Sequence, residues 1–85
     1  MSQVDQILSG SVAFYPLGEA NVNLVVNGLV KRFETAGVTY RVGDMSTEFK
    51  GLFPQVMALV NDLVNYATEH SEFVMDIKLS NLCGL

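Results

Sequence analysis

The hydrophobic positions in the first part of the chain follow two different periods. Residues 7–15 alternate between apolar and small or polar side chains, which is the pattern of a half-buried strand, and Pro16 and Gly18 are expected to end it. Residues 20–36 repeat apolar side chains at three- and four-residue steps, which predicts an amphipathic helix. The apolar stripe of this helix consists of Val22, Val25, Val26, Leu29, Val30 and Phe33.

The middle of the chain predicts a β-hairpin between two helices. Residues 39–42 and 46–50 contain β-forming side chains such as Tyr40 and Phe49. Gly43 and Asp44 lie between these segments, and both residue types favour tight turns. The hairpin is therefore the centre about which the two halves of the chain mirror each other.

The second half predicts a helix followed by a strand. The helix begins near Pro54, since proline suits the first helical turn, and it ends around residues 69–71. Residues 73–80 return to strict alternation and predict the last strand. The apolar face of the helix consists of Val56, Val60, Leu63, Val64 and Ala67, widened by Met57 and Leu59.

The resulting order, βαββαβ, predicts a ferredoxin-like α+β sandwich formed by a single domain over residues 1–85. We expect a four-stranded antiparallel sheet with both helices on one face and the opposite face open. Gly28, in the middle of the first helix, is expected to permit close packing, because it otherwise costs about 1 kcal/mol relative to Ala. Strand parity assigns the following residues to the open face: Ser9, Ser11, Ala13, Tyr15, Thr39, Arg41, Ser46, Glu48, Lys50, Asp76, Lys78 and Ser80.

Composition narrows the possible partners. The 85 residues carry a net charge of −4 with only five Lys and Arg residues, which argues against nucleic acid, whose affinity depends on phosphate contacts. The charge is compatible with a small cationic ligand and is also ordinary for an acidic domain. Cys83 has no cysteine partner, and with His70 alone it cannot form a zinc site. We see neither a signal peptide nor a membrane span, so we expect a cytoplasmic protein without a membrane partner.

Three segments together resemble a known family. They are Tyr15-Pro16-Leu17-Gly18 after the first strand, Gly43-x-Met45-Ser46-Thr47-x-x-x-Gly51 in the hairpin, and Ile77-Lys78-Leu79-Ser80 in the last strand. Their order and spacing resemble the small thiamine-binding proteins of the DUF77, or UPF0045, group over nearly the whole chain. In one respect the sequence departs from that pattern, because Lys50 stands where the family often has an acidic residue.

The resemblance implies a ferredoxin-like fold, assembly into dimers or tetramers, and binding of thiamine or its hydroxymethylpyrimidine precursor without catalysis. Such a protein requires no cofactor and holds the small molecule as a bound ligand. The candidate ligand-binding residues are Ser11, Tyr15, Leu17, Met45, Thr47, Glu48, Asp76, Lys78 and Ser80.

Several of these residues also have a purely structural interpretation. Tyr15 either stacks on a heteroaromatic ring or simply ends a strand. Glu48 either accepts from a ligand amine, or pairs with a thiazolium, or forms a cross-strand pair with Arg41. Met45 and Thr47 suit packing as well as binding.

A structural interpretation is also available for the last strand and for His70 and Cys83. Asp76, Lys78 and Ser80 are also what a solvated edge strand would carry. His70 and Cys83 are assigned no catalytic role, because no partner lies at a recognisable spacing.

The fold alone leaves other functions open. A regulatory module of the amino-acid-sensing kind shares it, as does a small oxygenase of the dimeric barrel type. Acylphosphatase chemistry also uses it, but the Arg and Asn of that phosphate site are not evident near the first strand. Because a domain of 85 residues has a small core, we also expect a homo-oligomer, with the open sheet face contributing to assembly.

Overall fold

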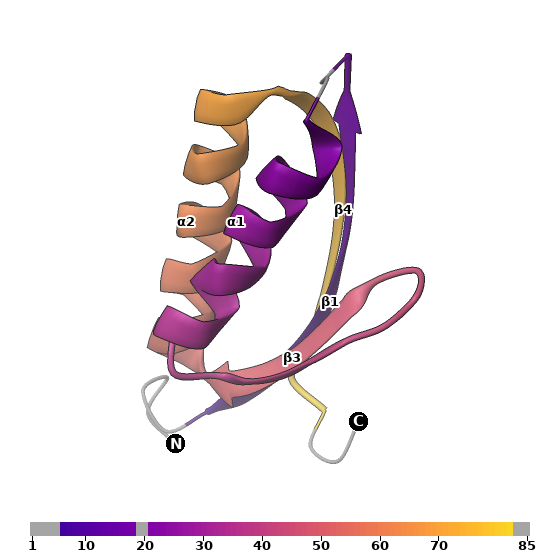
Figure 1. Cartoon of the computed structure of the whole chain (residues 1–85). Helices are drawn as coiled ribbons and strands as arrows, with labels where there is room; N and C mark the ends of the chain where they lie inside the picture. The colour runs from indigo at the N-terminus through magenta and orange to yellow at the C-terminus, as the bar shows by residue number, and fades with distance from the viewer. Residues whose placement is uncertain (1–5, 19–20, 83–85) are drawn as a thin grey trace.

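The computed structural model describes residues 6–18 and 21–82, and it has the predicted element order (Figure 1). Residues expected at the start of the first helix, such as Ala20, and in the tail from Cys83 to Leu85 lie outside the described residues. The elements are β1 (Ile7–Leu17), α1 (Val22–Thr35), β2 (Thr39–Val42), β3 (Thr47–Leu52), α2 (Phe53–His70) and β4 (Glu72–Ser80).

The sheet has the strand order β2-β3-β1-β4, and every neighbouring pair is antiparallel. Both helices lie against the same side of the sheet, so the other side is open (Figure 1). This arrangement confirms the ferredoxin-like α+β sandwich. It follows from two right-handed strand–helix–strand units whose first and third strands pair in the centre.

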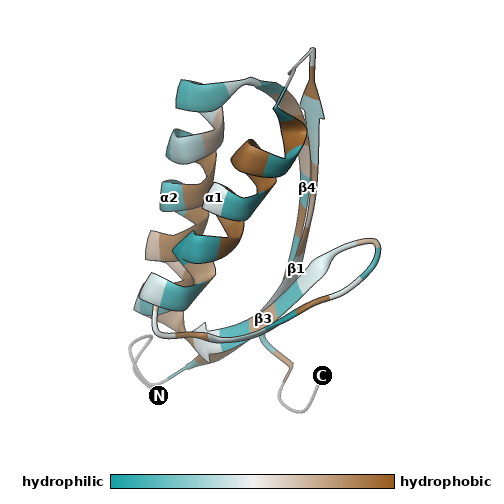
Figure 2. Cartoon of the chain, in the orientation of Figure 1, coloured by the Kyte–Doolittle hydropathy of each residue, from teal (hydrophilic) through white to brown (hydrophobic). Residues whose placement is uncertain are grey.

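The core lies between the helices and the sheet and is formed by alternate strand residues and by one stripe of each helix. Figure 2 shows how hydrophobic and hydrophilic residues alternate along both helices. The predicted stripes are confirmed in their centres, whereas Val22, Met57 and Val64 at their margins are exposed. The buried apolar side chains are Leu8, Val12, Val25, Leu29, Phe33, Val38, Phe49, Val56, Leu59, Leu63 and Ala67.

Strand β1 is longer than the sequence predicted, because it continues through Pro16 to Leu17. Pairing with β3 ends at Val12, whereas pairing with β4 continues to the end of β1. Pro16 therefore lies where β1 has one neighbouring strand among the described elements, and a residue without an N–H group is tolerated there. The far half of β1 and β4 forms a two-stranded ribbon that extends along the helices (Figure 1).

The two helices approach closely at Gly28, as the sequence predicted. A Cβ atom at Gly28 would lie 1.8 Å from the Tyr66 hydroxyl oxygen, and that hydroxyl donates a hydrogen bond of 3.2 Å to the Val25 carbonyl. Arg32 stacks over the Tyr66 ring at 4.9 Å and forms an ion pair of 3.7 Å with Asp62. A glycine at this position is what lets Tyr66 reach the α1 backbone.

Two further findings concern the described part of the chain. No helix there is long and apolar enough to cross a membrane. Within residues 6–18 and 21–82, no three His, Cys, Asp or Glu side chains come together in the way that a metal ion would require.

Candidate functional site

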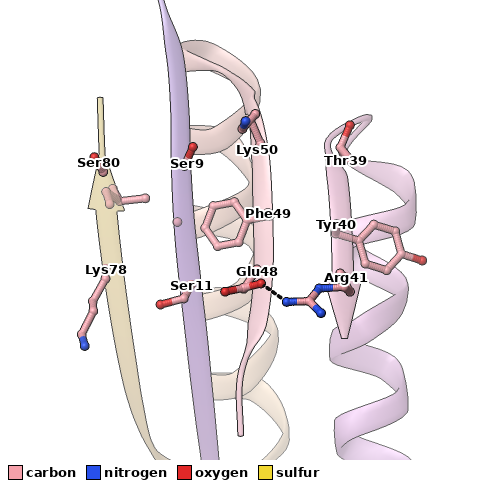
Figure 3. A pocket seen from close by; sticks show the side chains of 12 residues that line it. Ser9, Ser11, Thr39, Tyr40, Arg41, Glu48, Phe49, Lys50, Lys78 and Ser80 are labelled. Carbon is pink, nitrogen blue, oxygen red and sulfur yellow. Dashed lines mark hydrogen bonds and ion pairs between the residues drawn. The ribbon is translucent and has the colours of Figure 1, made fainter. Parts of the chain in front are cut away.

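Eight side chains on the open face of the sheet form two parallel rows, because the register of the three strand pairs places them directly opposite one another (Figure 3). Consecutive residues on one face of a strand are about 6.6 Å apart, and neighbouring strands are about 4.8 Å apart. The two rows therefore form a compact patch across all four strands. The first row is Ser80, Ser9, Lys50 and Thr39, and the second is Lys78, Ser11, Glu48 and Arg41.

A hollow of about 400 Å³ lies over these rows. Gly10, Tyr40, Phe49 and Leu79, which alternate with the row residues along the strands, complete its lining. Gly10 has no room for a side chain, because a Cβ atom would lie 2.5 Å from the Phe49 ring and 2.7 Å from the Lys78 carbonyl oxygen. The hollow is large enough for a small heterocyclic ligand.

Arg41 and Glu48 form a cross-strand ion pair at the β2 side of the hollow (Figure 3). The guanidinium donates a hydrogen bond to the Glu48 carboxylate, and this bond and the carboxylate charge raise the pKa of Arg41 above its usual value. The structural interpretation of Glu48 is therefore confirmed. Its carboxylate already has a cationic partner, which lowers its capacity to bind a cationic ligand.

Two cations in the hollow have no partner among the residues that the structure describes. Lys50 and Lys78 form no hydrogen bond or ion pair with any other residue that the structure describes. In Figure 3 the Lys50 side chain leans towards β1, whereas Lys78 extends outward from the edge strand β4. Among the described lining residues, three cations and one carboxylate leave a formal charge of +2.

One hydroxyl group in the hollow is buried and has no partner in the described part of the chain. The Ser9 Oγ atom is shielded from solvent and has no hydrogen-bond partner within the described part of the chain. Ser9 lies between Lys50 on β3 and Ser80 on β4. A buried hydroxyl without a partner is costly, and a bound molecule that displaced the side chains covering this atom would supply the missing hydrogen bond.

The hollow brings together four of the nine candidate residues, namely Ser11, Glu48, Lys78 and Ser80. Tyr15 and Leu17 are about half exposed on the far ribbon, opposite Val74 and Glu72. At about 3.3 Å per residue, Tyr15 is roughly 13 Å from Ser11 along β1. The ring stacking proposed for Tyr15 stays a prediction, and it would belong to a second part of the face.

The other three candidates also lie outside the hollow. Asp76 pairs with Ala13 in the ribbon, just beyond the second row. Met45 is 82% exposed in the β2–β3 turn. Thr47 lies opposite the buried Val12, and therefore on the helix side of the sheet, as its parity predicted.

The sequence placed Ser9, Thr39, Arg41 and Lys50 on the open face but did not select them as site residues. Strand alternation could have identified them as candidates, because all four residues share the sheet face of Ser11 and Glu48. The pairing of Arg41 with Glu48 was already one interpretation of the sequence, and what was missing was the register of β1 against β3, which places Lys50 beside Ser9.

Beneath the hollow, an aromatic cluster supports β2 and β3. Phe33 lies 5.7 Å from both the Tyr40 and the Phe49 rings. Partial burial raises the pKa of the Tyr40 phenol above its usual value, and the Glu34 carboxylate raises it further. Tyr40 is therefore a neutral packing residue at physiological pH.

Comparison with known proteins defines the class. The ferredoxin-like fold recurs in a candidate thiamine biosynthesis or salvage protein from Thermotoga maritima (22% identity, 92% of this chain and 86% of that chain, TM-score 0.79). It recurs in a DUF77 domain from Bacillus cereus (21% identity, 99% and 84%, TM-score 0.80) and in a hypothetical protein from Methanocaldococcus jannaschii (16% identity, 94% and 84%, TM-score 0.77).

The sequence itself identifies the family. Residues 10–81 match the family described as thiamine-binding protein. The chain therefore belongs to the thiamine-binding protein family, which confirms the resemblance seen in the sequence. No curated protein matches the chain.

Proposed function

We propose that this chain is a non-catalytic binding protein for thiamine or its hydroxymethylpyrimidine precursor, and that the hollow on the open sheet face contributes to the binding site. The family match over residues 10–81 carries this proposal. The hollow supports it with a volume suited to one heterocycle, a floor of strand residues and polar side chains at its rim.

The absence of catalysis is part of the proposal. The titratable lining residues are Arg41, Glu48, Lys50, Lys78 and Tyr40. Arg41 is held protonated by Glu48, and a tyrosine with a raised pKa is a poor general base at neutral pH. These groups suit recognition by hydrogen bonds and charge.

A thermal unfolding assay tests the ligand. A compound present at 100 times its Kd stabilises the folded state by about 2.7 kcal/mol, which raises the Tm of a domain of this size by roughly 10–20 °C. We expect such a shift with thiamine or with hydroxymethylpyrimidine, and saturable heat in calorimetry at neutral pH. No shift and no heat with either compound at millimolar concentration would refute the proposal.

We further propose that the chain acts as a homo-oligomer that uses the open face. Tyr15, Leu17 and Val74 expose about half of their area on the far ribbon of this face, and a two-fold contact would bury them against their own copies. Small residues, such as Ser11 and Ala13, allow a second sheet to approach closely.

Light scattering tests assembly independently of the ligand. We expect a dimer or tetramer at tens of micromolar, and we expect Ser11→Arg to weaken it because the change places an unpaired charge in the contact. Lys31→Arg on the exposed surface of α1 is the control. A monomeric wild-type protein would refute the proposal, and an oligomer insensitive to Ser11→Arg would place the interface elsewhere.

A further inference from the structure

We infer that the hollow on the open sheet face receives the phosphate monoester end of a ligand, so that the chain binds phosphorylated hydroxymethylpyrimidine in preference to the unphosphorylated pyrimidine. The inference rests on the proposed function for the pyrimidine end of the ligand. For the phosphate end it rests on the charge and the hydroxyl groups of the hollow.

The distribution of charge over the chain is the first observation that favours an anionic ligand. The whole chain has a net charge of −4 and only five basic residues, yet Arg41, Lys50 and Lys78 all line this one hollow. The other two, Lys31 and Arg32, lie on α1. A local formal charge of +2 on an acidic domain attracts an anion.

The second observation is which of those charged side chains already have an ionic partner. Glu48 is the carboxylate among the described lining residues, and Arg41 already binds it. Lys50 and Lys78 have no acidic partner within the described residues. The two ammonium groups therefore remain available for charge-assisted hydrogen bonds to phosphate oxygens.

The third observation is the row of hydroxyl groups beside these lysines. Ser9, Ser80 and Thr39 share a row with Lys50, and Ser11 lies between Lys78 and Glu48. The buried Ser9 Oγ atom has no partner among the described residues. A phosphate monoester offers three acceptor oxygens, which suits a row of hydroxyl donors beside a lysine better than it suits an uncharged hydroxymethyl group.

Calorimetry with matched ligands tests the inference at constant ionic strength. We expect hydroxymethylpyrimidine phosphate to bind at least about tenfold more tightly than hydroxymethylpyrimidine, as one charge-assisted hydrogen bond suffices for such a ratio. Lys50→Gln should remove most of this preference, and Lys78→Gln should remove less because its side chain extends away from β1 (Figure 3). Lys31→Gln makes the same change in net charge outside the hollow and should keep the preference.

Two further variants separate binding from folding. Ser9→Ala removes a buried hydroxyl with no described partner, so it should leave the urea midpoint unchanged or raise it, and it should weaken the phosphorylated ligand severalfold. Glu48→Gln frees Arg41 and should strengthen the phosphorylated ligand severalfold. Glu69→Gln, on the exposed surface of α2, is the charge-matched control and should leave the affinity for the phosphorylated ligand unchanged.

The outcomes distinguish this inference from the proposed function. If the pyrimidine binds and its phosphate binds no more tightly, or if the preference survives in Lys50→Gln and Ser9→Ala, the inference is wrong and the proposed function stands. If inorganic phosphate shifts the amide signals of Ser9 and Lys50 but no pyrimidine binds, the anion site stands and the proposed function falls. Weaker phosphate binding in Glu48→Gln would also overturn the inference.

Discussion

Replacing Gly28 with alanine is expected to destabilise this protein, although the same change inside an exposed helix stabilises by about 1 kcal/mol. The added Cβ atom would lie 1.8 Å from the Tyr66 hydroxyl oxygen and 2.6 Å from the ring carbon that bears it. Both distances are far below van der Waals contact, so the Tyr66 side chain has to move. Its movement removes contacts that join α1 to α2.

The magnitude follows from those contacts. The hydrogen bond from Tyr66 to the Val25 carbonyl contributes about 1 kcal/mol, and the stacking of Arg32 on the ring contributes about 0.5–1 kcal/mol. Overpacking of this kind costs about 1–3 kcal/mol altogether. After the gain in helix propensity of about 1 kcal/mol is subtracted, Gly28→Ala should lower the free energy of unfolding by up to about 2 kcal/mol.

Urea denaturation of four proteins measures this effect. Gly28→Ala should destabilise the wild type, whereas in a Tyr66→Leu background, which lacks the clashing hydroxyl and ring carbon, it should stabilise by up to about 1 kcal/mol. At the exposed neighbour Asn27, a comparison of Asn27→Ala with Asn27→Gly measures the propensity term alone. A wild-type background in which Gly28→Ala stabilises by the full propensity difference would refute the reasoning.

Two other substitutions test the sheet. Gly10→Ala should destabilise the protein more than Gly28→Ala does, by about 2–4 kcal/mol. Its Cβ atom would lie 2.7 Å from the Lys78 carbonyl oxygen, which belongs to the backbone and cannot rotate away. Urea denaturation measures the loss of stability, and a loss below about 1 kcal/mol would contradict the expected clash. Glu48→Gln removes an exposed ion pair with Arg41 and should change stability by less than about 1 kcal/mol. The same assay checks it, with Glu69→Gln as control, and a larger loss would show that the pair stabilises the β2–β3 hairpin more than an exposed pair does.

The sequence determined the fold, because its elements differ in period and are separated by turn residues. Alternation in β1 and β4, the helical repeat in α1 and α2, and the Gly43–Asp44 turn are local signals that each element carries within itself. The face of each strand residue followed from the same alternation, which is why Ser9 and Lys50 could be placed on the open side. The three segments that resemble the thiamine-binding family were likewise recognised from the sequence alone.

The tertiary structure decided what local signals cannot contain. The extension of β1 through Pro16 depends on its pairing there with β4 alone among the described strands. The role of Gly28 depends on Tyr66, 38 residues away in the other helix. The composition of the hollow depends on register, because a strand's sequence states which face a side chain occupies but not which residue lies opposite it. The Arg41–Glu48 pair was already one interpretation of the sequence, but only the register between β1 and β3 placed Lys50 beside the Ser9 hydroxyl, which has no partner among the described residues, and gathered three cations around one hollow.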